Sequence, residues 1–335
     1  MALLRVDYNV PLNSKGRVQD PTKIKESFPT IDYLLKNKVK VALLSHLEHE
    51  GKVVSLQPIY KWLQKKYPEL VFFKFPAFAK APASPAKRGE SAGRQILNIN
   101  LLENTRFLPG ETENDPVLAK QLASLGDLFI NEAFSVSHRN HVSTVGLSNY
   151  LPTYLGFNHF QELKILDEFF GNIKRPFVAI VGGAKWETKL PIAIKLAEIA
   201  DHVLLGGILA REYLRQIQIT NHKSQINDKI QMSKIKTPNS INGQDIDTET
   251  IKQYSEIIKT AKTVLWNGPM GKYEEPKYRK GSLAILKAIA LNKNCRAIVG
   301  GEDTLPALRH SPYLKSIYHV TTAGGALLNY VANLK

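Results

Sequence analysis

Short apolar runs alternate with longer amphipathic stretches along most of the chain, and this pattern predicts alternating strands and helices. The clearest unit begins at residues 177–181, FVAIV, which are apolar enough to be buried on both faces of a sheet. The glycines at 182–183 end this run and allow a tight turn. Leu190, Ala193 and Ala197 then recur at helical spacing, so the segment predicts a strand, a turn and a helix.

The same rhythm predicts further elements in both halves of the chain. Asp20 followed by Pro21 is a typical helix start, so a helix is expected from there to about residue 37. A second helix is expected at 56–66. The predicted strands of the first half are 3–6, 38–45, 71–74, 96–102 and 128–131. Those of the second half, besides 177–181, are 203–205, 264–266, 297–299 and 317–320.

Strands that alternate with helices favour an α/β fold with parallel sheets. Because 335 residues exceed the size at which one core usually keeps growing, two domains are expected. The apolar-periodic stretch 156–170, followed by Gly171, predicts a helix that connects them. We therefore expect two doubly wound, Rossmann-like lobes at 1–155 and 173–335, joined by a hinge helix at 156–172.

One stretch of the first half does not follow the strand–helix rhythm. Residues 76–95 are mostly Ala, Pro, Lys, Ser, Gly and Arg, without apolar periodicity. Such a composition cannot bury enough apolar surface to offset the entropy of ordering the chain. We expect a flexible, solvated insertion there, with no catalytic role.

Charge and cysteine content narrow the range of partners and compartments. The chain has 45 Lys and Arg against 30 Asp and Glu, a net charge of +15, which favours anionic partners. The basic residues are spread along the chain, so we expect no specific nucleic-acid binding. Cys295 is the only cysteine, which excludes an internal disulfide and suits a reducing compartment. Without a signal peptide or a long apolar run, we expect a cytoplasmic protein that does not enter membranes.

Polar side chains follow several strands of the first half at the point where each strand ends. Asp7 and Asn9 follow the first strand, and His46 follows the second. Arg106 and Arg139 follow two later strands. Because ligands bind at the carboxyl ends of parallel strands, these residues predict a site for a small anion that also carries hydroxyl groups.

Strands of the second half run into glycine-rich turns, and this repetition indicates a phosphate site built from backbone N–H groups. Lys185 and Lys189, four residues apart, are expected on one face of a helix start, where an anion would be stabilised. Two solvated surface lysines are the alternative reading. The turn at 182–183 is not a Walker loop, because no G-x-x-x-x-G-K-[ST] occurs. The dinucleotide fingerprint G-x-G-x-x-G is also absent, which argues against an NAD enzyme.

Taken in chain order, the motifs resemble those of phosphoglycerate kinases. The resemblance covers nearly the whole chain, and its collinearity is more specific than any one motif. The matching segments are RVDYNVP at 5–11, SHL at 45–47, ENTRF at 103–107, AFSVSHRNH at 133–141, GGAKWETK at 182–189 and WNGPMG at 266–271.

The resemblance implies that the first lobe binds phosphoglycerate, that the second binds ATP or ADP with Mg²⁺, and that the lobes close for phosphoryl transfer. It implies a monomer in which Lys185 and Lys23 are catalytic and Asp303 holds the metal. The implied phosphoglycerate-binding residues are Asp7, Asn9, Lys23, His46, Arg106 and Arg139. The implied nucleotide-binding residues are Gly182, Gly183, Lys189, Gly206, Gly207, Asn267, Glu274, Gly301, Asp303, Thr304, Gly324 and Gly325.

Several positions depart from the family pattern. Lys23 stands where the family has an arginine, so the charge is kept but the bidentate guanidinium is lost. His49 stands where the family has another arginine, and the stretch 216–251 is shorter than in the family. Two alternatives to the kinase therefore stay open: a catalytically weak descendant that binds phosphorylated metabolites or nucleic acid, and a related kinase that acts on another carboxylate.

Overall fold

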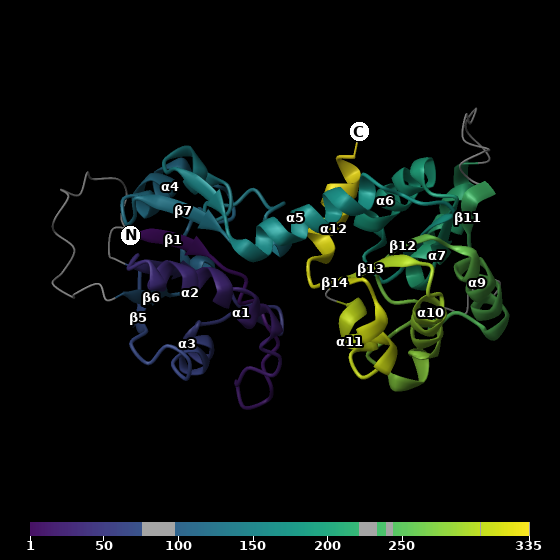
Figure 1. Ribbon diagram of the computed structural model, residues 1–335, viewed down its shortest axis with the longest axis horizontal. Coiled ribbons are helices and arrows are strands. Elements are labelled where there is room, and N and C mark those ends of the chain that lie inside the picture. The colour runs from purple at the N-terminus through teal and green to yellow at the C-terminus, as the bar shows by residue number, and fades with distance from the viewer. Residues whose placement is uncertain (76–97, 221–232, 239–243, 302, 335) are drawn as a thin grey trace. The chain divides into compact units, whose positions relative to one another are not determined.

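The structure, a computed structural model, describes residues 1–75, 98–220, 233–238, 244–301 and 303–334 (Figure 1). The expected insertion at 76–95 lies outside these residues. The chain divides into two compact units, 1–166 and 167–335, and helix α5 (Phe157–Phe170) crosses the division. We describe each unit by itself.

The first unit is built on a parallel sheet with the strand order β5-β6-β2-β1-β7-β8. Its strands are β1 (Ala2–Arg5), β2 (Val41–Leu44), β5 (Val71–Phe73), β6 (Ile99–Leu102), β7 (Leu128–Asn131) and β8 (Thr153–Leu155). Its helices, besides the first part of α5, are α1 (Thr22–Glu26), α2 (Phe28–Lys36), α3 (Gln57–Leu63) and α4 (Pro116–Ala123). The predicted strands are present, and the β8 edge strand, whose residues are all exposed, was not predicted.

Both faces of this sheet are covered, as a doubly wound fold requires (Figure 1). Leu4 of β1 lies in a core cluster with Ile31 of α2. The next residue back, Leu3, lies in a different cluster with Leu122 of α4. Since successive side chains of a strand point to opposite faces, α2 and α4 cover opposite sides of the sheet.

The expected single helix from Asp20 to about residue 37 is wrong, because two helices form there. α1 ends at Glu26 and α2 begins at Phe28, with Ser27 between them. Pro29 lies in the first turn of α2, where it has no N–H to donate and its ring would clash with a preceding carbonyl in a continuous helix. Ser27 Oγ donates to Ile24 O at 2.8 Å and lies 3.0 Å from the hydroxyl of buried Tyr8, which ties the break to the core.

A small hairpin, also not predicted, follows β2. Its strands are β3 (Glu48–His49) and β4 (Lys52–Val53). Glu50 and Gly51 connect them with φ values of 50° and 73°, the left-handed conformation that tight hairpin turns need. His49, which replaces a family arginine, lies in this hairpin.

The second unit repeats the plan with the parallel strand order β11-β10-β9-β12-β13-β14. The strands are β9 (Phe177–Val181), β10 (His202–Leu205), β11 (Ile235–Lys236), β12 (Thr263–Asn267), β13 (Arg296–Gly300) and β14 (His319–Thr321). The helices are α6 (Trp186–Ile199), α7 (Gly207–Thr220), α9 (Thr248–Thr260), α10 (Lys280–Leu291), α11 (Thr304–Leu308) and α12 (Gly324–Ala332).

Alternation again separates two helical layers in this unit (Figure 1). Val178 and Ile180 of β9 share a core cluster with Ile258 of α9 and Ile285 of α10. α6 contacts β9 and β10 and packs against α7 and α12. No helix within the described residues is long and apolar enough to cross a bilayer.

Arg296, at the start of β13, holds the C-terminal end of α5. Its Nη2 donates to Glu168 O and Phe169 O, each at 2.9 Å, and to Asn172 O at 3.3 Å. The guanidinium lies 5.2 Å from the Phe169 ring centroid. A cation is favourable at this point because the last helical carbonyls lack intrahelical donors and carry the negative end of the helix dipole.

We expect Arg296→Ala to lower the free energy of unfolding of the second unit by about 1–3 kcal/mol, because it removes charged donors from several carbonyls. Arg296→Lys should recover only part of this loss, since an ammonium cannot reproduce the planar fork. Urea unfolding followed by circular dichroism measures the change. Lys287→Ala, at an exposed site on α10, is the control and should stay within about 0.5 kcal/mol. Equal stability of the two alanine variants would contradict the prediction.

Candidate active sites of the two units

Asp7 is the centre of the polar cluster at the carboxyl edge of the first sheet. It is buried, and its Oδ2 lies 2.8 Å from Lys23 Nζ and also accepts a hydrogen bond from Ser135 Oγ. Its Oδ1 accepts from Asn9 N at 3.0 Å. Burial alone would raise the pKa of Asp7, but the charge of Lys23 and the hydrogen bonds from Lys23 and Ser135 hold the pKa well below its ordinary value. The carboxylate is therefore ionised and paired with Lys23.

Arg106 is connected to the same cluster through the hairpin. Asn9 Oδ1 accepts from Glu48 N at 2.9 Å, and Glu48 Oε1 lies 3.4 Å from Arg106 Nη1. Arg106 lies in a 3-10 turn, Thr105–Phe107, which is capped by the side chain of Asn104. The guanidinium is thus held at the end of β6 while part of its surface stays exposed.

His46 is almost fully buried next to several cations. Its Nδ1 lies 3.0 Å from Arg5 Nη2, and since a guanidinium can only donate, Nδ1 must accept. The proton of the neutral ring is therefore on Nε2, which has no hydrogen-bond partner among the described residues. Burial and the charges of Arg5, Arg106 and Arg139 lower the pKa of His46 well below its ordinary value. His46 is a neutral donor that still needs an acceptor.

Arg5 has a supporting role that the motif alone did not suggest. Its side chain is buried, and its Nε donates to Ser143 Oγ at 3.0 Å. Ser143 Oγ in turn bonds to the buried carboxylate of Glu111, whose charge favours the guanidinium. The sequence did contain a signal for this role, because Arg5 is the last residue of the otherwise apolar strand β1. A buried charge at that position needs buried polar partners.

The structure therefore brings the expected first-lobe residues together. Lys23 and Asn9 contact Asp7, Arg106 is connected to Asn9 through Glu48, and Arg139 acts electrostatically on His46. Arg139 also contributes, after burial and Arg106, to lowering the pKa of His141 to about 4. The cluster contains more cations than carboxylates, which suits an anion.

The glycine-rich turns of the second unit lie against one another at the carboxyl edge of its sheet. A Cβ on Gly182 would lie 2.2 Å from Pro269 O, and one on Gly206 would lie 2.7 Å from Met270 Sδ. Gly268 has φ +93°, and a Cβ on it would lie equally close to Gly182 O. Several N–H groups of these turns are already bonded within the protein, such as Gly182 N to Asn267 O at 2.9 Å. These glycines are therefore required by packing between the turns. The first turns of α6, α7 and α12, whose N–H groups have no intrahelical acceptors, are the better candidates for phosphate binding.

Lys185 and Lys189, expected on one face of a helix start, differ in their exposure to solvent. Lys185 is the N-cap residue of α6 and is exposed. Lys189 is buried, and its Nζ donates to Gly182 O at 2.8 Å. Burial lowers the pKa of Lys189 to about 8, with Asp303 opposing and Lys185 adding to the shift. The spacing of the two lysines alone does not report this difference in burial.

Thr304 and Asn267 connect neighbouring turns. Thr304 Oγ1 accepts from Gly268 N at 2.7 Å and donates to Gly300 O at 2.8 Å. Asn267 is buried and its Nδ2 donates to Gly324 O at 3.4 Å. Both side chains therefore hold the edge together, whereas Glu274 is exposed.

Asp303 is the carboxylate through which this edge could bind a metal. It is half-buried and forms a hydrogen bond with the Tyr273 phenol. Within the described part of the chain, no group of three or more His, Cys, Asp or Glu side chains is arranged to hold a metal ion. Nucleotide-bound Mg²⁺ needs only one or two protein carboxylates, because phosphates and waters complete its octahedron. A single Asp303 fits that kind of binding.

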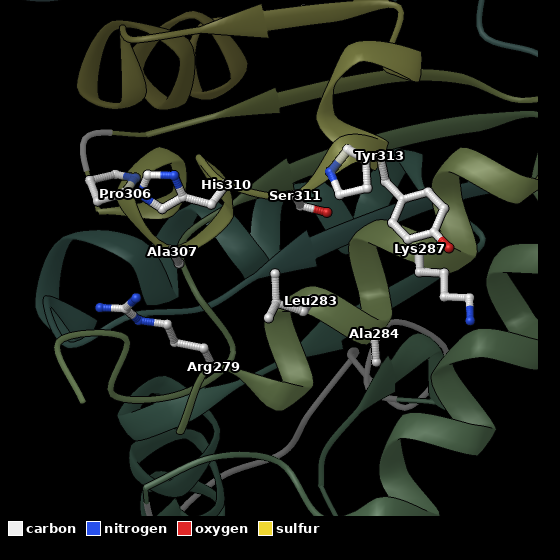
Figure 2. Close-up of a pocket in the computed structure, with 10 residues that line it drawn as sticks. Arg279, Leu283, Ala284, Lys287, Pro306, Ala307, His310, Ser311 and Tyr313 are labelled. Carbon is white, nitrogen blue, oxygen red and sulfur yellow. The ribbon is translucent and has the colours of Figure 1, made fainter. Parts of the chain in front are cut away.

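A pocket of about 440 Å³ lies apart from these turns, between α10, α11 and the 3-10 turn Pro312–Ser316 (Figure 2). Leu283, Ala284 and Ala307 line it together with Arg279 and Lys287. None of the residues expected to bind the nucleotide lines this pocket. It is therefore distinct from the candidate nucleotide site.

Known proteins match this chain over both of its units. The family model described as phosphoglycerate kinase matches residues 1–237 and 216–333, and so extends over both units. The chain belongs to the phosphoglycerate kinase family. The resemblance seen in the motifs is thus confirmed.

Individual members of the phosphoglycerate kinase family match over nearly full length. The phosphoglycerate kinase of Pelotomaculum thermopropionicum is 34% identical over 370 residues, which cover 98% of this chain and 92% of the relative. That of Thermus thermophilus is 33% identical over 369 residues, covering 98% and 93%.

Solved phosphoglycerate kinases share the fold. The structure from Coxiella burnetii has a TM-score of 0.75 and 27% identity, covering all of this chain and 93% of that chain. The structure from Pyrococcus horikoshii has a TM-score of 0.81 at 24% identity with the same coverage, which supports the fold alone. The predicted α/β fold with two lobes is confirmed. The expected cytoplasmic location, monomeric state and lack of nucleic-acid binding stay predictions.

The Asp7–Lys23 pair leads to a prediction about stability and pH. Asp7→Asn should cost about 3 kcal/mol at pH 7, since it leaves the largely buried Lys23 without its counter-charge. Because the folded pKa is depressed, ionised Asp7 stabilises the fold above its ordinary pKa of about 3.9, and this advantage should decline as the pH falls towards the folded value. Urea titrations of both proteins over a pH series measure the difference.

Asp115→Asn is the matched control for this prediction. Asp115 caps α4 by accepting from Leu118 N at 2.7 Å, and asparagine caps helices about equally well. We expect little change for it at any pH. Equal losses in the two variants would contradict a specific contribution of the buried pair.

Proposed function

We propose that this chain catalyses reversible phosphoryl transfer from 1,3-bisphosphoglycerate to ADP, giving 3-phosphoglycerate and ATP. The observation that carries this proposal is the match to the phosphoglycerate kinase family across both units, with Lys185, Arg106 and Arg139 retained. In the forward direction the bond between the phosphoryl group and the carboxyl oxygen breaks. A β-phosphate oxygen of ADP forms the new bond, and no covalent link to the protein is needed.

In the first unit, the cationic cluster would hold the glycerate. Arg106 and Arg139 would bind its 3-phosphate, because guanidinium groups match phosphate oxygens bidentately. Asp7 and Asn9 would orient the hydroxyl and carboxyl groups. The Nε2–H of His46, buried and without a partner among the described residues, would donate to a substrate oxygen.

In the second unit, the first turns of α6, α7 and α12 would bind nucleotide phosphates, through free N–H groups and the positive ends of the helix dipoles. Lys185, exposed at the start of α6, would neutralise the phosphoryl group as it transfers. Lys189 would contribute charge from its position on the Gly182 carbonyl. Mg²⁺ held by Asp303 would supply further charge neutralisation to the nucleotide phosphates.

ATP-dependent phosphorylation of 3-phosphoglycerate by the purified protein, read by a coupled dehydrogenase, tests the proposal. We expect turnover by the native chain and a loss in kcat of about 10²–10³-fold in Lys185→Ala, with little change in KM, because the Lys185 contact forms mainly in the transition state. Lys195→Ala is the control, since Lys195 is a surface residue of the same helix that pairs with Glu198 at 3.1 Å. A native protein without turnover would overturn the proposal, and a defect in KM alone would overturn the role of Lys185.

Lys23 gives a second test of the site. Its ammonium, which replaces the family arginine, lies 2.8 Å from Asp7 Oδ2 and so forms an ion pair with that carboxylate. We expect Lys23→Arg to raise kcat several-fold, because a guanidinium can keep the Asp7 contact and still present further donors to the substrate. The same coupled assay measures it. A rate that is unchanged or lower would show that position 23 acts differently here than in the family.

A further inference from the structure

Glu132, directly after β7, links the first sheet to the start of α5. The side chain is only 3% exposed. Its Oε1 accepts from Thr30 Oγ1 of α2 at 2.8 Å and from Asn158 N in the first turn of α5 at 3.3 Å. Thr30 Oγ1 also accepts from Phe157 N at 2.9 Å. The first N–H groups of α5 are therefore bonded to side chains of two different elements of the first unit.

The carboxylate of Glu132 is also closely packed against the residue that precedes α5. Glu132 Oε2 is buried without a hydrogen-bond partner among the described residues. A Cβ added to Gly156 would lie 1.7 Å from this oxygen. Gly156 N itself donates to Asn131 O at 2.9 Å. The residue before α5 is thus held both to the end of β7 and against the carboxylate.

The turn that carries Glu132 also carries residues of the candidate phosphoglycerate site. Glu132 N donates to Arg5 O at 2.9 Å, which fixes the turn to β1. Three residues later, Ser135 Oγ donates to Asp7, and Arg139 follows in the same segment. A displacement of Glu132 would therefore also displace Ser135 and Arg139.

α5 is held in a complementary way at its other end. There, within the second unit, Arg296 donates to Glu168 O and Phe169 O. A carboxylate at the N-terminus and a guanidinium at the C-terminus both match the helix dipole. Each unit therefore holds the end of α5 that it contains with a charge of the favourable sign.

We propose that Glu132 is a positioning residue, which fixes the first turn of α5 to the turn that carries Ser135 and Arg139. Through this contact, the arrangement of the phosphoglycerate site and the direction in which α5 leaves the first unit are set together. The inference rests on the proposed kinase function. It assigns Glu132 no contact with the substrate.

The protonation of Glu132 gives the contact a signature near neutral pH. Burial raises its pKa to about 7, while hydrogen bonds from Thr30, Asn158 and His159 oppose this shift. The titratable neighbours of Glu132 are Tyr8 and His159. The charge of Glu132 adds to the burial that raises the pKa of Tyr8, and burial lowers the pKa of His159. Glu162 and Glu26 lie further along α5 and α1. Because the folded pKa is raised, the fold loses stability as the pH rises from the ordinary value towards 7. The charged form accepts more strongly from Asn158 N, so kcat should rise as Glu132 ionises in the folded protein, around pH 7.

Glu132→Ala and Glu132→Gln, compared with the native chain between pH 6 and 8, test the proposal. We expect Glu132→Ala to lower kcat about tenfold while KM for 3-phosphoglycerate stays within about twofold, because positioning is lost and binding groups are not. Glu132→Gln keeps the Oε1 acceptor, so it should retain most of the activity but lose the rise of kcat near pH 7. It is also close in shape to the native residue, and so remains informative if the alanine variant does not fold.

Asp115→Ala is the control, since it removes the cap of another helix of the same unit. It should lower the urea midpoint without changing kcat. Equal kcat losses in Glu132→Ala and Asp115→Ala, a change in KM alone, or an unaltered pH profile in Glu132→Gln would overturn the proposal.

Amide exchange of residues 157–159, read by mass spectrometry or NMR, separates this inference from the proposed function. Exchange should accelerate at least tenfold in Glu132→Ala and stay unchanged in Asp115→Ala. If the native chain had no kinase activity but showed this exchange pattern, the kinase proposal would fail and the anchoring of α5 would stand. Unchanged exchange in Glu132→Ala would overturn the anchoring whatever the activity.

Discussion

Parallel strand pairing is the constraint on which the rest of this structure depends. In each unit six strands run in one direction, so all of their carboxyl ends meet at one edge while both faces are covered by helices. Charged side chains are costly in the apolar middle of such a sheet, and those of the two candidate sites lie at that edge. The first unit uses the edge to gather cations around Asp7, whereas the second uses it to gather helix starts and glycine turns. One architecture thus provides two surfaces with different chemistry.

The electrostatics of the first unit depend on a few buried pairs. Arg5 is tolerated inside because Ser143, His46 and Glu111 surround its guanidinium, and burial together with the Arg5 charge keeps His46 neutral. Asp7 is ionised because Lys23 compensates it. The substitution of lysine for the family arginine at position 23 is therefore more than a change at the substrate surface. It also determines which cation neutralises the central carboxylate.

Much of this could be predicted from the sequence, because strong apolar runs and strand-end motifs report local structure directly. The run at 177–181 is β9, and the first-unit motif residues Asp7, Asn9, His46, Arg106 and Arg139 do come together. The failures have physical causes. Pro29 interrupts the single helix that was expected from the start signal at Asp20 and Pro21. The burial of Lys189 and the internal bonds of Thr304 depend on contacts between turns that are distant in sequence, and no local pattern reports them.

The close approach of the glycine turns has a consequence for how this edge can be studied. Gly182, Gly206 and Gly268 have neighbouring backbone or side-chain atoms where a Cβ would be, so any side chain there must push one turn away from the next. Loss of activity on replacing one of them would therefore report disrupted packing and could not be read as loss of a ligand contact. Information about nucleotide binding has to come from the exposed side chains around these turns. The same crowding means that the turns can diverge only together, because a larger residue in one needs a compensating change in its neighbour.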